Sequence, residues 1–116
     1  MFQHVGHDGA LIPQSASTLP ELRQAVATVL PARLPEFFND MQSAFAAAGE
    51  QDSVLPIRMF YRRWGVTIAI ERDPDTAARL HAAERALNDE DPEIRRQAIR
   101  EAGAIARAAH AQVAGE

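Results

Sequence analysis

His81 and Glu84 are the side chains whose types and spacing come nearest to a catalytic or metal-binding arrangement. They stand three residues apart, which places both on one face of a helix, and di-metal helical bundles use such histidine-carboxylate pairs several times over. Here the pair occurs once, whereas a metal ion needs three or four ligands. We therefore expect a polar contact on a half-buried helix face rather than a metal site.

Other routes to catalysis are missing from the sequence. His4 and His7 could chelate a metal, but they stand in a segment with glycines and serines and without periodicity, where histidines are usually solvated. The chain has no cysteine, no serine in a nucleophile-elbow motif and no glycine-rich phosphate-binding loop. We therefore expect a non-enzymatic protein without a cofactor.

The segment RMFYRRW, residues 58–64, combines three arginines with the only Trp and the only Tyr of the chain. Its aromatic residues fall on a periodic apolar helix face, and their burial is a simpler prediction than base stacking, which needs exposed rings. The three arginines would then pair with acids such as Glu36, Asp40 and Glu71, or form the polar rim of a docking site. Trp, Tyr and Arg are the residue types that concentrate binding energy at interfaces.

Net charge bears on which partners the protein accepts. The 116 residues carry a formal charge of -4, and all twelve basic residues are arginine. A net acidic domain is repelled by a polyphosphate unless its charges are segregated, so a basic, toxin-like protein partner is the easier fit. The alternative is a small dimeric DNA-binding regulator that uses the three arginines. Our candidate partner-binding residues are Arg58, Arg62, Arg63, Glu71, His81 and Glu84.

Capping signals and hydrophobic periodicity predict the first two helices. Thr18 and Glu21 form a capping box at the start of a helix over about 19–30. A short connection follows between Pro31 and Pro35, and the second helix ends at Gly49. These two segments predict an all-α fold.

The third helix begins with a cap at Asp52 or Ser53 and runs to about Arg72. Its second half contains Gly65 and a β-branched run, and a strand at 66–70 is therefore the alternative. Asp73-Pro74 and Asp91-Pro92 each place a capping Asp before a Pro at the first helical position, and they predict a fourth and a fifth helix. Both of these helices have thin, alanine-rich apolar faces.

The domain organisation follows from these elements. Residues 1–17 have no periodicity and are expected to form a flexible N-terminal arm, while residues 18–116 form a single helical domain, a small bundle of about four to five helices. No signal peptide or membrane span is visible, so we expect a cytoplasmic protein, and a homodimer is compatible with the sequence.

A wider resemblance rests on two segments, LPELRQAVATVLPARLPEFFNDMQSAFAAA and VLPIRMFYRRWGVTIAIERDPDTAARLHAAERAL. Together with a last alanine-rich helix, they make residues 18–112 resemble a family of short, uncharacterised actinobacterial proteins known as a domain of unknown function. The part around Trp64 carries the most specific resemblance. It implies an antitoxin-like role as a candidate, and it supplies no catalytic residue.

Overall fold

The computed structural model describes residues 18–114. They form five α-helices and one 3₁₀ turn: α1 Leu19–Val29, η1 Pro31–Arg33, α2 Leu34–Gln51, α3 Leu55–Glu71, α4 Pro74–Ala86 and α5 Pro92–Ala114. The predicted small all-α bundle is confirmed. A strand at 66–70 is wrong, because these residues continue α3. The expected flexible arm, residues 1–17, lies outside the described residues.

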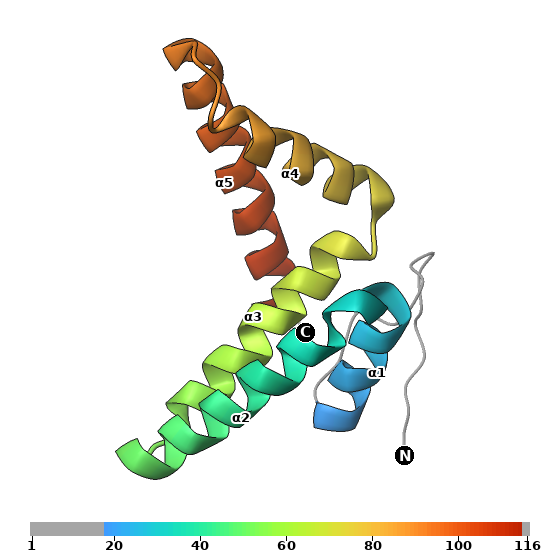
Figure 1. Ribbon diagram of the computed structural model, residues 1–116, viewed down its shortest axis with the longest axis vertical. Coiled ribbons are helices and arrows are strands. Elements are labelled where there is room, and N and C mark those ends of the chain that lie inside the picture. Colours follow the sequence, from blue (N-terminus) through green and yellow to red (C-terminus); the bar gives the residue numbers. More distant parts are fainter. Residues whose placement is uncertain (1–17, 115–116) are drawn as a thin grey trace.

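Helix α3 is the central element, since every other α-helix packs against it (Figure 1). Helix α2 runs antiparallel beside α3, and α1 packs on both of them. Helices α4 and α5 form a second hairpin, and α5 crosses behind α3. The α2–α3 connection and the α4–α5 connection therefore lie at opposite ends of the molecule. None of these helices is long and apolar enough to cross a bilayer.

Three of the helix starts were predicted correctly. The Thr18 hydroxyl accepts a hydrogen bond from the Glu21 backbone N–H, and the Glu21 carboxylate accepts one from the Thr18 N–H, both at 3.3 Å. Asp73 accepts bonds from two backbone N–H groups in the first turn of α4. Asp91 accepts one from the Glu93 N–H at 2.9 Å. Each cap satisfies donors that the first turn of a helix leaves without an intrahelical partner.

The ends of α2 differ from the prediction. Pro35 lies in its first turn instead of in a connection, where its missing N–H removes no intrahelical bond. Gly49 does not end the helix; Asp52 does, with the left-handed angles φ 52° and ψ 50° that Asp tolerates better than most residues. Asp52 therefore does not cap α3. Ser53 accepts a bond from the Leu55 N–H at 3.1 Å, although Val54 is the N-cap residue.

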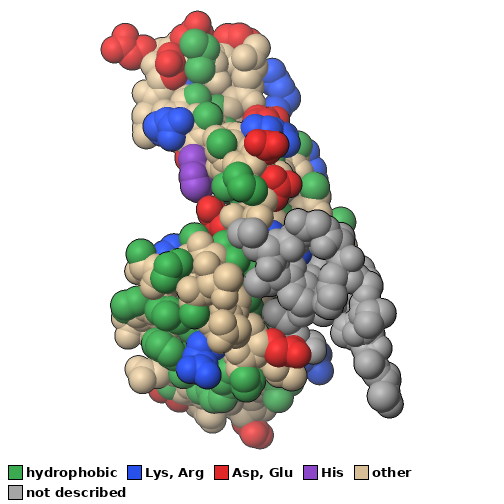
Figure 2. All heavy atoms as spheres, turned by 90° about the vertical axis from the view of Figure 1, so that its right-hand side faces the viewer, with side chains coloured by type: hydrophobic (Ala, Val, Ile, Leu, Met, Phe, Trp, Pro, Cys, Tyr) green, Lys and Arg blue, Asp and Glu red, His purple; other side chains and the backbone are tan. Residues whose placement is uncertain are grey.

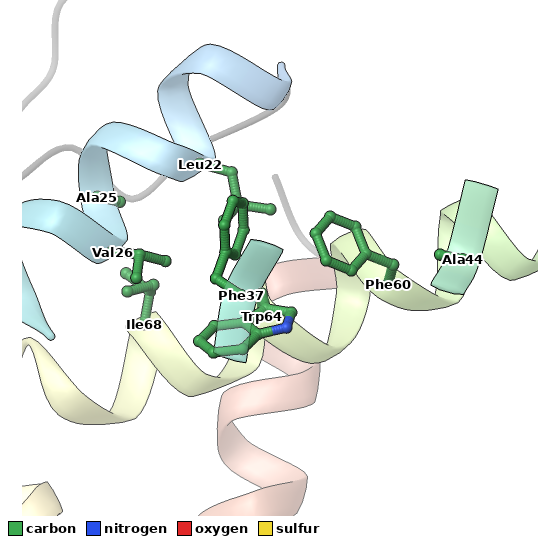
Figure 3. Packing of buried hydrophobic residues seen from close by; sticks show 8 residues of the cluster. All are labelled: Leu22, Ala25, Val26, Phe37, Ala44, Phe60, Trp64 and Ile68. Carbon is green, nitrogen blue, oxygen red and sulfur yellow. The ribbon is translucent and has the colours of Figure 1, made fainter. Parts of the chain in front are cut away.

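The larger core lies between α1, α2 and α3 (Figure 3). Trp64 is 1% exposed, so its predicted burial is confirmed. Its ring meets Phe37 edge-on with 5.3 Å between centroids, and Phe37 also contacts Phe60 at 5.2 Å. Burying side chains of this size contributes about 1.5–3 kcal/mol each. The cluster comprises Leu22, Ala25, Val26, Phe37, Ala44, Phe60, Trp64 and Ile68.

A second, smaller core joins α3 to α5. It contains Val66, Ala69 and Ile70 from α3 with Ile105 and Ala109 from α5. The buried residues of α4 are alanines, and two of the three buried residues of α5 are alanines as well, in agreement with the predicted alanine-rich faces. Small side chains let helix axes approach closely, so this hairpin packs without a bulky interior.

Candidate functional site

The structure divides the six candidate residues into two groups. The arginines 58, 62 and 63 lie on the outer half of α3, toward the α2–α3 connection. Glu71 lies at the other end of α3, beside His81 and Glu84 of α4. The two groups are separated by about half the length of α3, so they do not form one site.

Arg63 forms an ion pair between α3 and α2. Its guanidinium forms an ion pair with the Asp40 carboxylate of α2, with 3.2 Å between Nη2 and Oδ2. The same Oδ2 accepts a hydrogen bond from the indole Nε1–H of Trp64 at 3.0 Å. A buried indole usually needs such an acceptor. The predicted pairing with Asp40 is therefore confirmed for Arg63, and this ion pair joins the surface of α3 to that of α2.

Arg33 is a neighbour of Trp64 that sequence reasoning missed. Its guanidinium carbon lies 4.9 Å from the centre of the indole ring, a cation–π contact. It also donates two hydrogen bonds to Glu36, at 2.8 and 2.9 Å. These bonds hold the pKa of Glu36 below its ordinary value and raise the pKa of Arg33. Glu36 therefore pairs with Arg33, and not with an arginine of α3 as expected.

Arg58 and Arg62 form no ion pair within the described part of the chain, and both are exposed. They share one face of α3 with Leu55 and Met59, and Val54 precedes these residues at the N-cap. Three of these side chains are apolar and strongly exposed: Val54 at 59%, Leu55 at 56% and Met59 at 61%. We call this surface, Val54, Leu55, Arg58, Met59 and Arg62, the α3 stripe.

The α3 stripe continues a line of positions on α3 that packs against α5, and we call this line the seam. Positions 55, 59, 62, 66 and 69 follow the alternating four- and three-residue spacing of a helix–helix contact. In the second half of α3, α5 covers this line, because Val66 and Ala69 pack against Ile105 and Ala109. In the first half, α5 leaves Leu55 and Met59 exposed. The same helix face is thus covered along one half and uncovered along the other.

Hydrophobic exposure is not confined to this helix. Phe38 and Phe45 of α2 are 38% and 46% exposed. Figure 2 shows one face of the molecule, on which hydrophobic side chains gather over the part of the molecule below its narrow waist. The α3 stripe differs from these other exposed apolar side chains in that its apolar residues lie beside two arginines, Arg58 and Arg62, that form no ion pair within residues 18–114.

The second group surrounds a cavity of about 210 Å³ between α3 and α4. His81 Nε2 lies 2.9 Å from Glu71 Oε2, so the hydrogen bond of His81 joins it to α3 rather than to Glu84. Two of the charged groups that line this cavity, Arg33 and Glu71, already have partners in Glu36 and His81. The cavity is lined by Arg33, Thr67, Ile70, Glu71, Leu80, His81 and Glu84.

A second cavity of about 210 Å³ lies between α3, α4 and α5. Arg79 on its wall pairs with Glu101 of α5 at 2.9 Å. Asp73 uses its carboxylate to cap α4, and the hydrogen bonds from the Thr76 backbone and hydroxyl lower its pKa. Across residues 18–114, no group of three or more His, Cys, Asp or Glu side chains could hold a metal ion.

Comparison with known proteins returned no matching family model, no matching curated protein and no matching solved structure. The resemblance to the actinobacterial family therefore stays a prediction.

Proposed function

We propose that this chain is a non-enzymatic protein-interaction module that binds and regulates a partner protein through the α3 stripe. One observation carries the proposal: the strongly exposed Leu55 and Met59 lie on a face of α3 whose other half is buried against α5, and the exposed Val54 precedes them at the N-cap. Contiguous exposed apolar side chains bordered by polar residues are typical of protein interfaces. Arginine is also one of the residue types that most often contribute a large share of the binding energy at an interface.

The contacts of the three arginines weaken the alternative of a DNA-binding regulator. Of the three arginines that this alternative used, Arg63 is paired with Asp40. Two arginines could neutralise about two phosphates, which gives little affinity in a chain of net charge -4. The exposed Leu55 and Met59 beside them would add no contact to a phosphate backbone.

A photo-crosslinking experiment tests the proposal. A photoreactive amino acid replaces Met59, and in a control protein it replaces Gln97, an exposed residue of α5. We expect a discrete crosslinked species from Met59 in an extract of the native host, and none of the same mass from Gln97. The species should be lost when Leu55→Ser is added, because the apolar contact is then removed.

The crosslinking result needs a folding control. Leu55 is exposed, so Leu55→Ser should change the free energy of unfolding by no more than about 0.5 kcal/mol. If Met59 and Gln97 give the same crosslinked species, or if Leu55→Ser leaves the species unchanged, the α3 stripe is not the docking surface.

A further inference from the structure

The charge of the α3 stripe points to the chemistry of its occupant. Arg58 and Arg62 are exposed and form no ion pair within residues 18–114, although the chain as a whole is acidic. The first turn of α3 contains no acidic residue that could pair with them. The five residues of the α3 stripe therefore carry two positive charges and no negative one, opposite in sign to the net charge of the chain.

The geometry of the seam points to the shape of the occupant. Along Val66 and Ala69, the face is filled by a helix, whose contacting residues are Ile105 and Ala109. The uncovered half from position 55 to 62 keeps the same spacing and spans about two helical turns. A second helix with apolar residues at alternating three- and four-residue steps would pack there in the same way.

A symmetric dimer through this face is electrostatically unfavourable. A two-fold axis pairs a surface with itself, so the two arginines of one copy would face the two arginines of the other. Like charges juxtaposed in an interface oppose association. A partner with carboxylates beside its apolar residues avoids this repulsion and pairs with both guanidinium groups.

We propose that the occupant of the α3 stripe is an acidic amphipathic helix of a partner protein. This inference rests on the proposed function and names the chemistry of the partner. It differs from the basic partner expected from the sequence, because that expectation used the net charge of the chain, whereas docking responds to the charge at the contact surface.

Two designed peptides of about 18 residues, long enough to be helical in isolation, test the proposal. Both have leucine on one helix face, and the flanking positions are glutamate in one peptide and lysine in the other. Each carries a fluorophore, and fluorescence anisotropy measures its affinity for the full chain. We expect tighter binding of the glutamate peptide, against the preference that the net charge of -4 would impose.

Charge reversal distinguishes the effect of the charge of the α3 stripe on peptide binding from the effect of the net charge of the chain. In R58E/R62E, the preference should shift toward the lysine peptide by about tenfold or more, as expected for several interfacial charge pairs. The matched control is R23E/R85E, which reverses two exposed arginines of α1 and α4 and changes the net charge equally. This control should bind the glutamate peptide as the wild type does. Thermal unfolding followed by circular dichroism checks that both variants fold.

Each contrary outcome has a definite meaning. Equal affinity for the two peptides, or the same shift in both variants, would overturn the inference. Sedimentation equilibrium that shows self-association lost in R58E/R62E would identify the occupant as a second copy, and displacement of the glutamate peptide by duplex DNA would identify it as a nucleic acid. Either result would overturn the inference that the occupant is an acidic helix. If the peptides fail while the Met59 crosslink persists, only the partner's chemistry is wrong; if both fail, the proposed function is wrong too.

Discussion

Truncation of Trp64 should be the most destabilising single substitution in α3. The side chain is 1% exposed and contacts Phe37 edge-on, so Trp64→Ala removes nearly its whole buried surface. Substitutions of this kind cost about 3–5 kcal/mol. Domains of this size have a free energy of unfolding of about 5–15 kcal/mol, so the variant should be strongly destabilised or partly unfolded.

Trp64→Phe keeps the prediction measurable if the alanine variant does not fold. It retains an aromatic ring beside Phe37 but removes the Nε1–H donor that binds Asp40 at 3.0 Å. A hydrogen bond to a charged acceptor contributes about 1.5–3 kcal/mol. Asp40 keeps its ion pair with Arg63, which moves the expected loss toward the lower end of this range.

Urea unfolding followed by circular dichroism at the helix band measures both variants, because fluorescence would lose its only Trp. A double-mutant cycle with Asp40→Ala, which removes the acceptor, isolates the interaction of the two side chains. A loss below about 1 kcal/mol for Trp64→Ala, well under the usual range for a buried aromatic, would refute the assignment of Trp64 to the core.

Three further predictions concern the helices. Thr18→Ala should lower the free energy of unfolding by about 0.5–2 kcal/mol in urea titrations, because it removes half of the capping box of α1; no change would mean that α1 does not need this cap. Gly65→Ala should raise it by about 0.5–1 kcal/mol, since a Cβ there would meet Val113 at an ordinary 3.5 Å and alanine favours helix; a loss would show that α3 and α5 cannot accept a methyl group. The pKa of Asp73 is lower in the folded protein than its unfolded value of about 3.9, so the ionised carboxylate stabilises the fold above that pH, and this contribution is lost as the pH falls through the folded pKa. In acid, the free energy of unfolding of the wild type should therefore fall more than that of Asp73→Asn. Parallel curves of unfolding free energy against pH for the two proteins would contradict the cap's role.

The helices could be predicted because their signals are local. Thr18 and Glu21, Asp73, and Asp91 mark helix starts through bonds that span two or three residues. The end of α2 was missed because it depends on which residue takes a left-handed conformation. Gly49 was the expected choice, yet the helix continues to Gln51 and Asp52 takes that conformation.

The contacts that define the two candidate regions were harder to predict, because they join residues distant in sequence. The partner of His81 was expected on its own helix, at Glu84, but it is Glu71 on α3. Asp40 was among the expected partners of the arginines, but its second contact, to the indole of Trp64, depends on the packing of α2 on α3. Periodicity identifies the apolar face of a helix and does not identify its neighbours.

Arg58 and Arg62 were named from the sequence, but the exposed apolar residues of the α3 stripe were missed because the surroundings of α3 change along its length. Its first half has one buried face, marked by Phe60 and Trp64, and in its second half Val66, Ala69 and Ile70 are also buried. A helix that packs on two sides loses the simple alternation of polar and apolar faces. This explains why the β-branched run resembled a strand. It also explains why Leu55 and Met59 did not stand out, since they lie on the face that α5 covers only beyond Gly65. That face has apolar residues along both halves because a helix packs on one half and, in our proposal, a partner's helix packs on the other.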